Sequence, residues 1–459
     1  MSQVNQRGAV QDTIGHPAAA LADYAAQNPS VSHYCIAYSG GRDSHVLLHA
    51  AASLFGDIDT IELRAIHVDH ALSDASASWA AHCVKTATRL GVELEVQRVR
   101  IENSGDGLEA AARTARYTAF AEFLKPGEHL LLAQHAADQA ETFLLQALRG
   151  SGPDGLASMP RKRTFASGIM ARPLITCMPE ALDVYAADCA LDWIEDPSNQ
   201  DLSFDRNFLR HEIMPLIRNR WPAAYRTLGR SAMRSAAASQ TLLGVADEDL
   251  ETVRMRGTNE FSVSELRSLP RERAYNALRL WVRQSNLRLP RLQDLARVMD
   301  ELVLARQDSL GLVNVRDYEF RRHGDRLYLL PPYVAIEAFD IPWEAPFDDL
   351  VVSDTGIVLR KQDCESQGIR LPTDELVSVR SRRGGELIKL GEPAFHKAVK
   401  KLLQEASVPP WQRDRVPLLY VGERLIAVWN VAVATDFRTP EVGSAVAETK
   451  TPDDVAEPA

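Results

Sequence analysis

Between residues 33 and 190, the sequence alternates short apolar runs with longer amphipathic segments. HYCIAYS precedes SHVLLHAAASLF, IELRAIHV precedes SASWAAHCVKTATRL, and EHLLLAQH precedes DQAETFLLQALRG. Strands that alternate with helices predict a doubly wound parallel sheet, because a parallel connection needs a crossover and the crossover helices then cover both faces. Ligands of such sheets bind at the carboxyl ends of the strands. The pattern therefore predicts an α/β fold and the edge of the sheet where a nucleotide site would lie.

The first strand-to-helix turn has the sequence SGGRDS, made of Ser39, Gly40, Gly41, Arg42, Asp43 and Ser44. Two glycines permit positive φ and leave backbone N–H groups open to a ligand, and the next helix directs its positive end to the same point. A phosphate is the natural ligand of such a turn. Asp43 would repel it unless a divalent cation such as Mg²⁺ lay between the two. The chain has neither a Walker GxxxxGK[ST] pattern nor a GxGxxG fingerprint. The alternative is an ordinary turn in which Asp43 or Ser44 caps the helix.

The rest of the chain divides into segments of different pattern. Helical periodicity replaces the strand signal in SELRSLPRERAYNALRLWVRQSNL, and strand-like runs return in PLLYVGERLIAVWNVAV. Prolines near residues 331–350 suggest a joint between these regions. We expect an N-terminal extension at residues 1–30, the α/β domain at 31–222, a helical substrate-binding domain at 223–335, a small α+β domain at 350–440 and a disordered tail at 441–459.

Composition narrows the class of protein. The chain has 459 residues, 45% of them hydrophobic, so it can bury more than one core. It contains no apolar run near the roughly 20 residues that cross a bilayer and no signal-peptide pattern, so we expect a cytoplasmic protein with no membrane partner. The five cysteines include no CxxC pair and no spacing typical of a metal site.

Charge is unevenly distributed along the chain. The net charge of −10 argues against a protein that coats nucleic acid indiscriminately. Two segments are nevertheless basic: residues 206–234 contain seven arginines and one acid, and residues 380–401 contain seven Lys or Arg and two acids. The pattern is compatible with a polyanion bound at local basic surface.

The loop sequence SGGRDS resembles the SGGxDS signature of the PP-loop ATP pyrophosphatases. The segments AIHVDHALS, GLEAAARTARY, AQHAADQAETFLLQALRGSGPDGLASM, RPLI and WIEDPSNQDLSFDRNFLR resemble, in order and spacing, the tRNA(Ile)-lysidine synthetase family across residues 31–222. VSVRSRRGGELIK and KAVKKLLQEASVPPWQRDRVPLLYVGERLIAV are similar to the C-terminal domain of that family.

The resemblance implies an ATP-dependent ligase. ATP would activate C2 of the wobble cytidine in a minor isoleucine tRNA with a CAU anticodon, and the ε-amine of free L-lysine would displace AMP. The product, lysidine, pairs with A instead of G, which changes codon reading from AUG to AUA. The implied cofactors are ATP and Mg²⁺, the implied partners are this tRNA and lysine, and a homodimer is compatible with the resemblance.

Two rival functions belong to other classes. A tRNA thiolase of the same superfamily would use paired cysteines, and no CxxC pair occurs here. A non-catalytic protein that binds nucleotide or RNA would not need Asp43 or Asp138.

The resemblance assigns ATP binding to the SGGRDS loop, and catalysis and Mg²⁺ to Asp43 and Asp138. Asp138, Glu141 and Thr142 share one face in the first turn of a predicted helix, where carboxylates also complement the helix dipole. The capping role therefore stays open beside the catalytic one. The family commonly shows two adjacent aspartates here, whereas this chain has Ala137 before Asp138.

Arginines and lysines supply the remaining candidates. Arg113 is expected to take part in catalysis by facing ATP or RNA phosphate, or to form an ordinary i,i+4 pair with Glu109. Lys397, Lys400 and Lys401 fall on one face of a predicted helix, and a solvated face is the usual alternative for such a stripe. Arg206 and Arg210 lie either on the path of the RNA or in a helix whose start is simply capped by a neighbouring residue. The residues expected to contact tRNA are Arg206, Arg210, Arg382, Lys397, Lys400 and Lys401.

Overall fold

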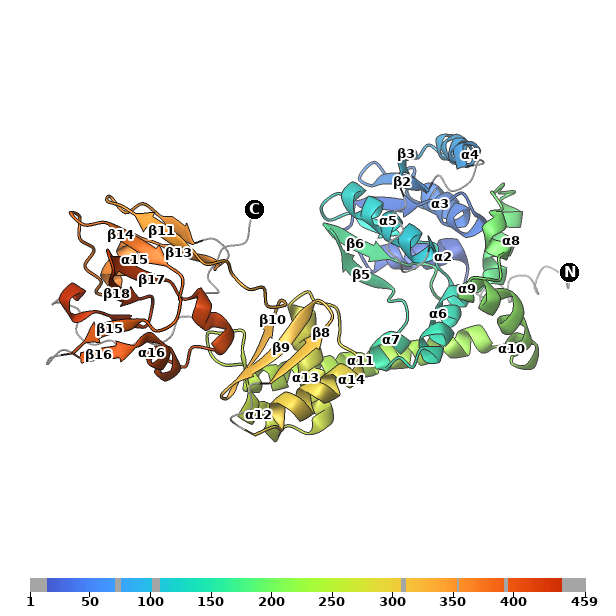
Figure 1. The fold of residues 1–459 in the computed structure, drawn as a ribbon. Helices are drawn as coiled ribbons and strands as arrows, with labels where there is room; N and C mark the ends of the chain where they lie inside the picture. Colours follow the sequence, from blue (N-terminus) through green and yellow to red (C-terminus); the bar gives the residue numbers. More distant parts are fainter. Residues whose placement is uncertain are drawn as a thin grey trace, which may run out of the picture. The chain divides into compact units, whose positions relative to one another are not determined.

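The computed structural model describes residues 15–70, 76–100, 108–306, 311–352, 355–391 and 395–439. The chain forms two compact units, residues 1–242 and 243–459 (Figure 1). The tail predicted at residues 441–459 lies outside the described residues. Within the described ranges, no helix is long and apolar enough to cross a membrane.

The first unit is built on a six-stranded sheet with the strand order β3-β2-β1-β4-β6-β5. Neighbouring strands are parallel except β5 and β6, which form an antiparallel pair at one edge. The parallel sheet predicted from the alternating pattern is confirmed. The strands are β1 (His33–Ala37), β2 (Glu62–Asp69), β3 (Glu93–Arg98), β4 (His129–Leu131), β5 (Lys162–Phe165) and β6 (Gly168–Ala171).

Helices cover both faces of this sheet. Cys35 and Ile36 are adjacent in β1, so their side chains point to opposite faces, and both are fully buried in separate apolar clusters. A further helix, α2 (Pro17–Ala26), lies within the segment expected as an extension and buries Leu21 and Tyr24 in the same cluster as Ile36. The helices that follow strands of the sheet are α3 (Arg42–Phe55), α4 (Ser76–Arg89), α5 (Leu108–Phe123), α6 (Ala136–Leu148) and, after the last strand, α8 (Pro179–Asp188).

A run of helical segments follows the sheet. It includes a stretch with π-type hydrogen bonding, η2 (Leu209–Ile213), between two α-helical segments. The boundary between the two compact units falls inside the last and longest of these helices. These segments are η1 (Pro197–Gln200), α9 (Asp205–Phe208), η2, α10 (Met214–Arg220) and α11 (Ala224–Val253), and one more short helix, α7 (Pro153–Leu156), precedes β5.

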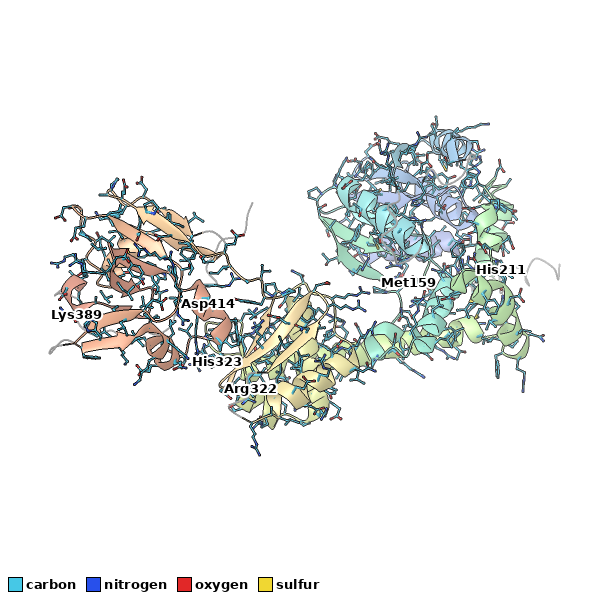
Figure 2. All side chains as sticks on the ribbon, in the orientation of Figure 1. Met159, His211, Arg322, His323, Lys389 and Asp414 are labelled. Carbon is cyan, nitrogen blue, oxygen red and sulfur yellow. The ribbon has the colours of Figure 1, made fainter. Side chains whose placement is uncertain are left out.

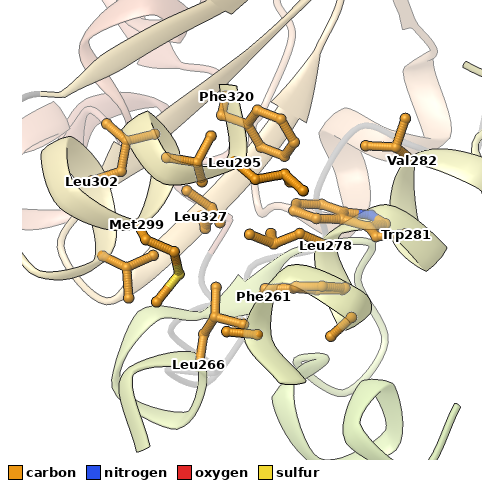
Figure 3. Packing of buried hydrophobic residues seen from close by; sticks show 14 of the residues in the cluster. Phe261, Leu266, Leu278, Trp281, Val282, Leu295, Met299, Leu302, Phe320 and Leu327 are labelled. Carbon is orange, nitrogen blue, oxygen red and sulfur yellow. The ribbon is translucent and has the colours of Figure 1, made fainter. Parts of the chain in front are cut away.

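Residues 261–330 combine helices with a four-stranded antiparallel sheet, β7-β10-β9-β8. Trp281 stacks on Phe261 in the apolar core, with ring centroids 3.8 Å apart (Figure 3). The sequence predicted a helical domain here, and the sheet is an addition to it, because its strands are short and the periodicity of the longer helices dominates the pattern. The elements are β7 (Phe261–Ser262), α12 (Val263–Ser268), α13 (Arg271–Gln284), α14 (Leu292–Arg297), η3 (Val298–Val303), β8 (Leu312–Val315), β9 (Tyr318–His323) and β10 (Arg326–Leu330).

The last part of the second unit has the α+β composition expected from the sequence. A five-stranded sheet, β11-β14-β17-β18-β19, and two hairpins enclose its core. The elements are β11 (Asp340–Trp343), β12 (Leu350–Val352), β13 (Ile357–Leu359), α15 (Lys361–Ser366), β14 (Val377–Arg380), β15 (Leu387–Leu390), β16 (Phe395–Ala398), α16 (Val399–Glu405), η4 (Pro410–Arg415), β17 (Leu418–Val421), β18 (Arg424–Val428), β19 (Ala432–Val433) and η5 (Thr435–Phe437).

One local prediction in this part is wrong. The helix predicted to carry Lys397, Lys400 and Lys401 begins only at Val399, because residues 395–398 pair with β15 as strand β16. Lys397 therefore lies opposite Ile388 in a hairpin, while Lys400 and Lys401 lie in α16. The three lysines do not share a helical face, since strand pairing overrides the local helical pattern.

Candidate active site

The strand order of the parallel sheet reverses at β1. β2 and β3 extend to one side of this strand, and β4 and β6 extend to the other. The SGGRDS loop follows β1, and Gln134 and His135 follow β4, its hydrogen-bonded neighbour. Doubly wound sheets bind their ligands at the carboxyl ends of the strands where the order reverses. The two turns therefore define the candidate site.

Gly40 allows the loop to approach the rest of the domain closely. Its φ is +88°, and a Cβ atom there would lie 2.8 Å from the Sγ of Cys83 and 2.9 Å from the Cδ1 of Ile194. The Ser44 hydroxyl donates to the Gly41 carbonyl at 2.9 Å and accepts the Ser39 N–H at 3.2 Å. A residue with a side chain at position 40 would both strain the backbone and clash.

The N-terminus of α3 has no side-chain cap. Gly41 is the N-cap residue, so neither Asp43 nor Ser44 caps the helix as the ordinary-turn alternative required. The first N–H groups of a helix have no partner within the helix, and the helix dipole adds positive potential there. This arrangement suits an anion such as a phosphate.

Asp43, in the first turn of α3, contacts residues from both turns. Its Oδ2 lies 3.4 Å from the Nε2 of His135, and its Oδ1 accepts the Nε–H of Arg42 at 2.9 Å. Burial raises the pKa of Asp43, but the hydrogen bond from His135 and the charges of His135 and Arg42 outweigh it and lower the pKa to about 2. Asp43 is therefore an anion at neutral pH.

His135 is the N-cap of α6 and joins the two carboxylates of the site. Its Nδ1 accepts the Ala137 N–H at 3.2 Å, and the Oδ2 of Asp138 accepts the His135 N–H at 2.9 Å, which is a reciprocal capping box. Because Nδ1 accepts this hydrogen bond, a neutral His135 carries its proton on Nε2, which faces Asp43. Burial lowers the pKa of His135, but the carboxylates of Asp138 and Asp43 raise it by more, so the net direction is upward.

The side chain of Ala137 lies in an apolar cluster and not in the candidate site. Its side chain is 4% exposed and packs in an apolar cluster with Met178 and Met214. At the position where the family commonly carries an aspartate, this chain therefore has a packing residue, and the hydrogen bond it provides comes from its backbone.

Asp138 and Glu141 are held by two arginines one helical turn apart. The Oδ1 of Asp138 accepts the Nη2–H of Arg206 at 2.8 Å and of Arg210 at 2.9 Å. Glu141 is fully buried and accepts the Nε–H of Arg206 at 2.9 Å and of Arg210 at 2.8 Å. We call these four residues the carboxylate–arginine clamp. Removal of one partner would leave a buried charge uncompensated, which is strongly destabilising.

The clamp contains three residues that the sequence predicted to be functional, Asp138, Arg206 and Arg210. The Arg206 and Arg210 guanidinium groups contact carboxylates rather than standing open for RNA phosphate. Both oxygens of Asp138 already accept hydrogen bonds, one from the backbone and one from the two arginines. Asp138 thus has the capping role left open by the sequence, and it lies next to the nucleotide loop through His135.

Arg113 lies on α5 against Tyr117. Its guanidinium carbon is 4.9 Å from the centroid of the tyrosine ring, and its Nη2 donates to the tyrosine hydroxyl at 3.3 Å. Together with Arg163, these residues line an open groove. Among the contacts described, none joins Arg113 to Asp43 or Asp138, so its place in catalysis stays a prediction.

The basic residues predicted in the C-terminal part differ in their surroundings. Arg382 lies 3.4 Å from Asp414, which is labelled in Figure 2, and 3.6 Å from Glu386. Lys397 pairs with Glu405, while Lys400 and Lys401 are exposed on α16. Contact of these four basic residues with tRNA stays a prediction.

Two residues of the site were missed from the sequence, His135 and Glu141. The signal was present, because a histidine three residues before an aspartate at a helix start is a capping pattern. In addition, Asp138 and Glu141 are three residues apart and Arg206 and Arg210 four, so each pair lies about one helical turn apart. What the sequence lacked was any indication that these two helical segments lie side by side.

A doubly wound sheet with an uncapped SGGRDS turn at its switch point defines a PP-loop protein, and the family model of the PP-loop domain matches residues 17–217. The TilS substrate binding domain matches residues 261–328, and the TilS substrate C-terminal domain matches residues 377–446. The tRNA(Ile)-lysidine synthase of Alkalilimnicola ehrlichii is 41% identical over 424 residues, which cover 91% of this chain and 94% of that protein. That of Coxiella burnetii is 38% identical over 412 residues, which cover 89% and 91%. The chain belongs to the tRNA(Ile)-lysidine synthase family.

Among solved structures, a U34-tRNA thiolase from Methanococcus maripaludis is 15% identical, with a TM-score of 0.36 over 44% of this chain and 70% of that chain. A likeness at this level carries no information on function. The family assignment rests on the relatives and the three matching domains.

Proposed function

We propose that this protein joins free L-lysine to C2 of the wobble cytidine in a minor isoleucine tRNA with a CAU anticodon. In the first step, the cytidine O2 attacks the α-phosphate of ATP, and pyrophosphate leaves. In the second step, the ε-amine of lysine attacks C2, AMP leaves with the oxygen, and the amine loses a proton. The observation that carries the proposal is the joint presence of the uncapped PP-loop turn and both domains of this family in one chain.

The SGGRDS loop would hold the phosphates of ATP. The free N–H groups at the start of α3 point to one place, and Gly40 lets the backbone approach without a side chain in the way. Binding there presents the α-phosphate at the edge where Asp43 and His135 meet. Such positioning, with charge stabilisation, supplies most of the catalysis in phosphoryl and nucleotidyl transfer.

Mg²⁺ fits this site with Asp43 as its main protein ligand. Asp43 is ionised, and its side chain is 36% exposed at the phosphate end of the loop. Across the described residues, no group of three or more His, Cys, Asp or Glu is arranged to hold a metal alone. Mg²⁺ commonly binds through one or two carboxylates with phosphate and water oxygens, so one aspartate beside ATP is sufficient. The cation would neutralise charge on the departing pyrophosphate.

Asp138 is the second proposed ligand, but it would have to release hydrogen bonds to bind a metal. Its Oδ1 is shared by Arg206 and Arg210. We therefore propose that Asp138 acts mainly by orienting His135 against Asp43, and that it reaches the metal only when the clamp opens. Arg113 would contribute from α5 by binding RNA or ATP phosphate.

The RNA would also contact the C-terminal part of the chain. Lys400 and Lys401 are exposed on α16 and suit phosphate binding, whereas Lys397 and Arg382 would first exchange their acidic partners. A homodimer stays a prediction, and sedimentation of the purified protein would test it.

The direct test is a lysine-transfer assay. Purified protein is incubated with ATP, Mg²⁺, radiolabelled lysine and the minor isoleucine tRNA, and label in the RNA is measured together with AMP. A tRNA of identical sequence with uridine in place of the wobble cytidine is the matched control. We expect label in the first RNA alone, and a protein that labels neither RNA would contradict the proposal.

A further inference from the structure

An apolar groove lies on the first unit beyond the clamp. It has a volume of about 440 Å³, and its lining includes Leu144 of α6, Ile217 of α10 and Leu228 of α11. Trp221, in the turn between α10 and α11, also lines it and is 61% exposed. A large aromatic side chain left open beside an apolar groove indicates a binding surface.

One of the residues that line this groove, Arg220, is basic. Arg220 lies beside Trp221, with its guanidinium carbon 5.7 Å from the ring centroid. Arg226, Arg230 and Arg234 follow at intervals of four residues on α11 and are exposed, but they lie on a different face of the helix from Ala224, Thr227 and Leu228, which line the groove. The sequence from Arg220 to Arg234 contains no acidic residue.

The exposed indole and the neighbouring guanidinium indicate which kind of ligand fits the groove. An indole next to a guanidinium offers a flat apolar surface on which a nucleobase stacks, and exposed arginines bind the adjoining phosphates. Only a base outside a double helix can present its face in this way. We propose that Trp221 and the groove form a stacking site for one unpaired nucleotide of the RNA substrate, with Arg220 on its backbone phosphate. That the RNA is the tRNA substrate rests on the proposed function.

The groove lies close to the reactive site. Leu144 follows His135, which contacts Asp43, by nine residues along α6, a rise of about 13.5 Å. Ala224, which lines the groove, belongs to the same apolar cluster as Ala137 and Ala140 in the first turns of α6. The nucleotide held at Trp221 and the base that reacts can therefore belong to the same single-stranded loop of the RNA.

Three variants test the stacking site: Trp221→Ala, Trp221→Phe and Leu216→Ala. Leu216 is 70% exposed on α10 but does not line the groove, so it controls for the loss of an exposed apolar side chain. The probe is an anticodon stem-loop RNA with 2-aminopurine placed at one unpaired position at a time, titrated over a series of salt concentrations. Thermal melting of each variant verifies that it is folded.

Trp221→Ala should weaken binding about tenfold or more, because stacking on an aromatic side chain is worth that much per base. The slope of log affinity against log salt should stay unchanged, since the substitution removes no charged group. Trp221→Phe should retain most of the affinity, Leu216→Ala all of it, and quenching of 2-aminopurine at one loop position should disappear in Trp221→Ala alone.

Two results would overturn the proposal. One is wild-type binding by Trp221→Ala. If that variant also sediments as a smaller assembly, the groove belongs to an interface with a second copy of the chain. The other is an equal loss for duplex RNA without unpaired nucleotides. Lysine transfer is measured separately, so loop binding through Trp221 in a protein that attaches no lysine would support the stacking site and remove the proposed function.

Discussion

Two neighbouring segments of the first unit carry arginines at the same four-residue spacing but in opposite environments. Arg206 and Arg210 hold the carboxylates of Asp138 and Glu141, whereas the arginines of α11 from Arg226 onward are exposed. The first pair therefore stabilises the fold and the site, and the second set is available to a ligand. Composition alone predicted one basic path across both segments, and only the partners of each guanidinium separate the two roles.

Loss of a clamp arginine should give the largest effect. Arg210→Ala leaves Glu141 and Asp138 with fewer cationic partners in a buried place, so we expect the free energy of unfolding to fall by about 3 kcal/mol. Arg230→Ala is the matched control, because an exposed arginine should change stability by less than about 0.5 kcal/mol. Urea unfolding measures both, and equal values would remove the distinction between the segments.

Asp43→Asn should separate stability from activity next to the clamp. The carboxylate is proposed to bind Mg²⁺, and its contacts with His135 and Arg42 stabilise the fold, so the variant should remain folded with a moderately lower melting temperature. AMP release should fall about 100-fold or more, in the range seen when one group that stabilises charge at a reactive centre is lost. A stable variant with near-normal turnover would exclude Asp43 from the chemistry.

Protonation of His135 should give a smaller effect that depends on pH. Asp138 and Asp43 raise its pKa above the ordinary value of 6.5 against the effect of burial. The protonated form therefore stabilises the fold fully below pH 6.5, and this contribution is lost as the pH rises through the folded-state pKa. The difference in melting temperature between wild type and His135→Gln should be larger at about pH 6 than at about pH 9. A difference that is constant with pH would contradict the raised pKa.

The lysines of the C-terminal part should give the smallest effect. Replacing Lys397, Lys400 and Lys401 with alanine should weaken tRNA binding and lower the salt slope by somewhat under one unit for each phosphate that no longer has a lysine partner. Lys397 should contribute least, because Glu405 already neutralises it. Filter binding over a salt series measures the slope, and ATP binding serves as the control. Unchanged affinity and slope would mean that these lysines form a solvated surface.

The sequence by itself determined the fold class, the position of the nucleotide loop and the family. Each of these depends on local information: alternating strands and helices, two adjacent glycines in a turn, and motifs in a fixed order. Gly40 shows why, since its φ of +88° is one that glycine adopts without the strain other residues would incur. The same local rules failed where strands were short, as in β7–β10 and at β16, because pairing with a distant segment decides such conformations.

Only the tertiary structure decided which charges meet. Glu141 and Arg210 are separated by 69 residues, and nothing in either segment specifies that α6 lies against α9 and η2. Burial then gives identical side chains different surroundings, because Arg206 and Arg210 pair with buried carboxylates while Arg226, Arg230 and Arg234 on α11 are exposed, and contact of Arg206 and Arg210 with RNA stays a prediction. The exposure of Trp221 was settled in the same way, by what packs around the turn that carries it.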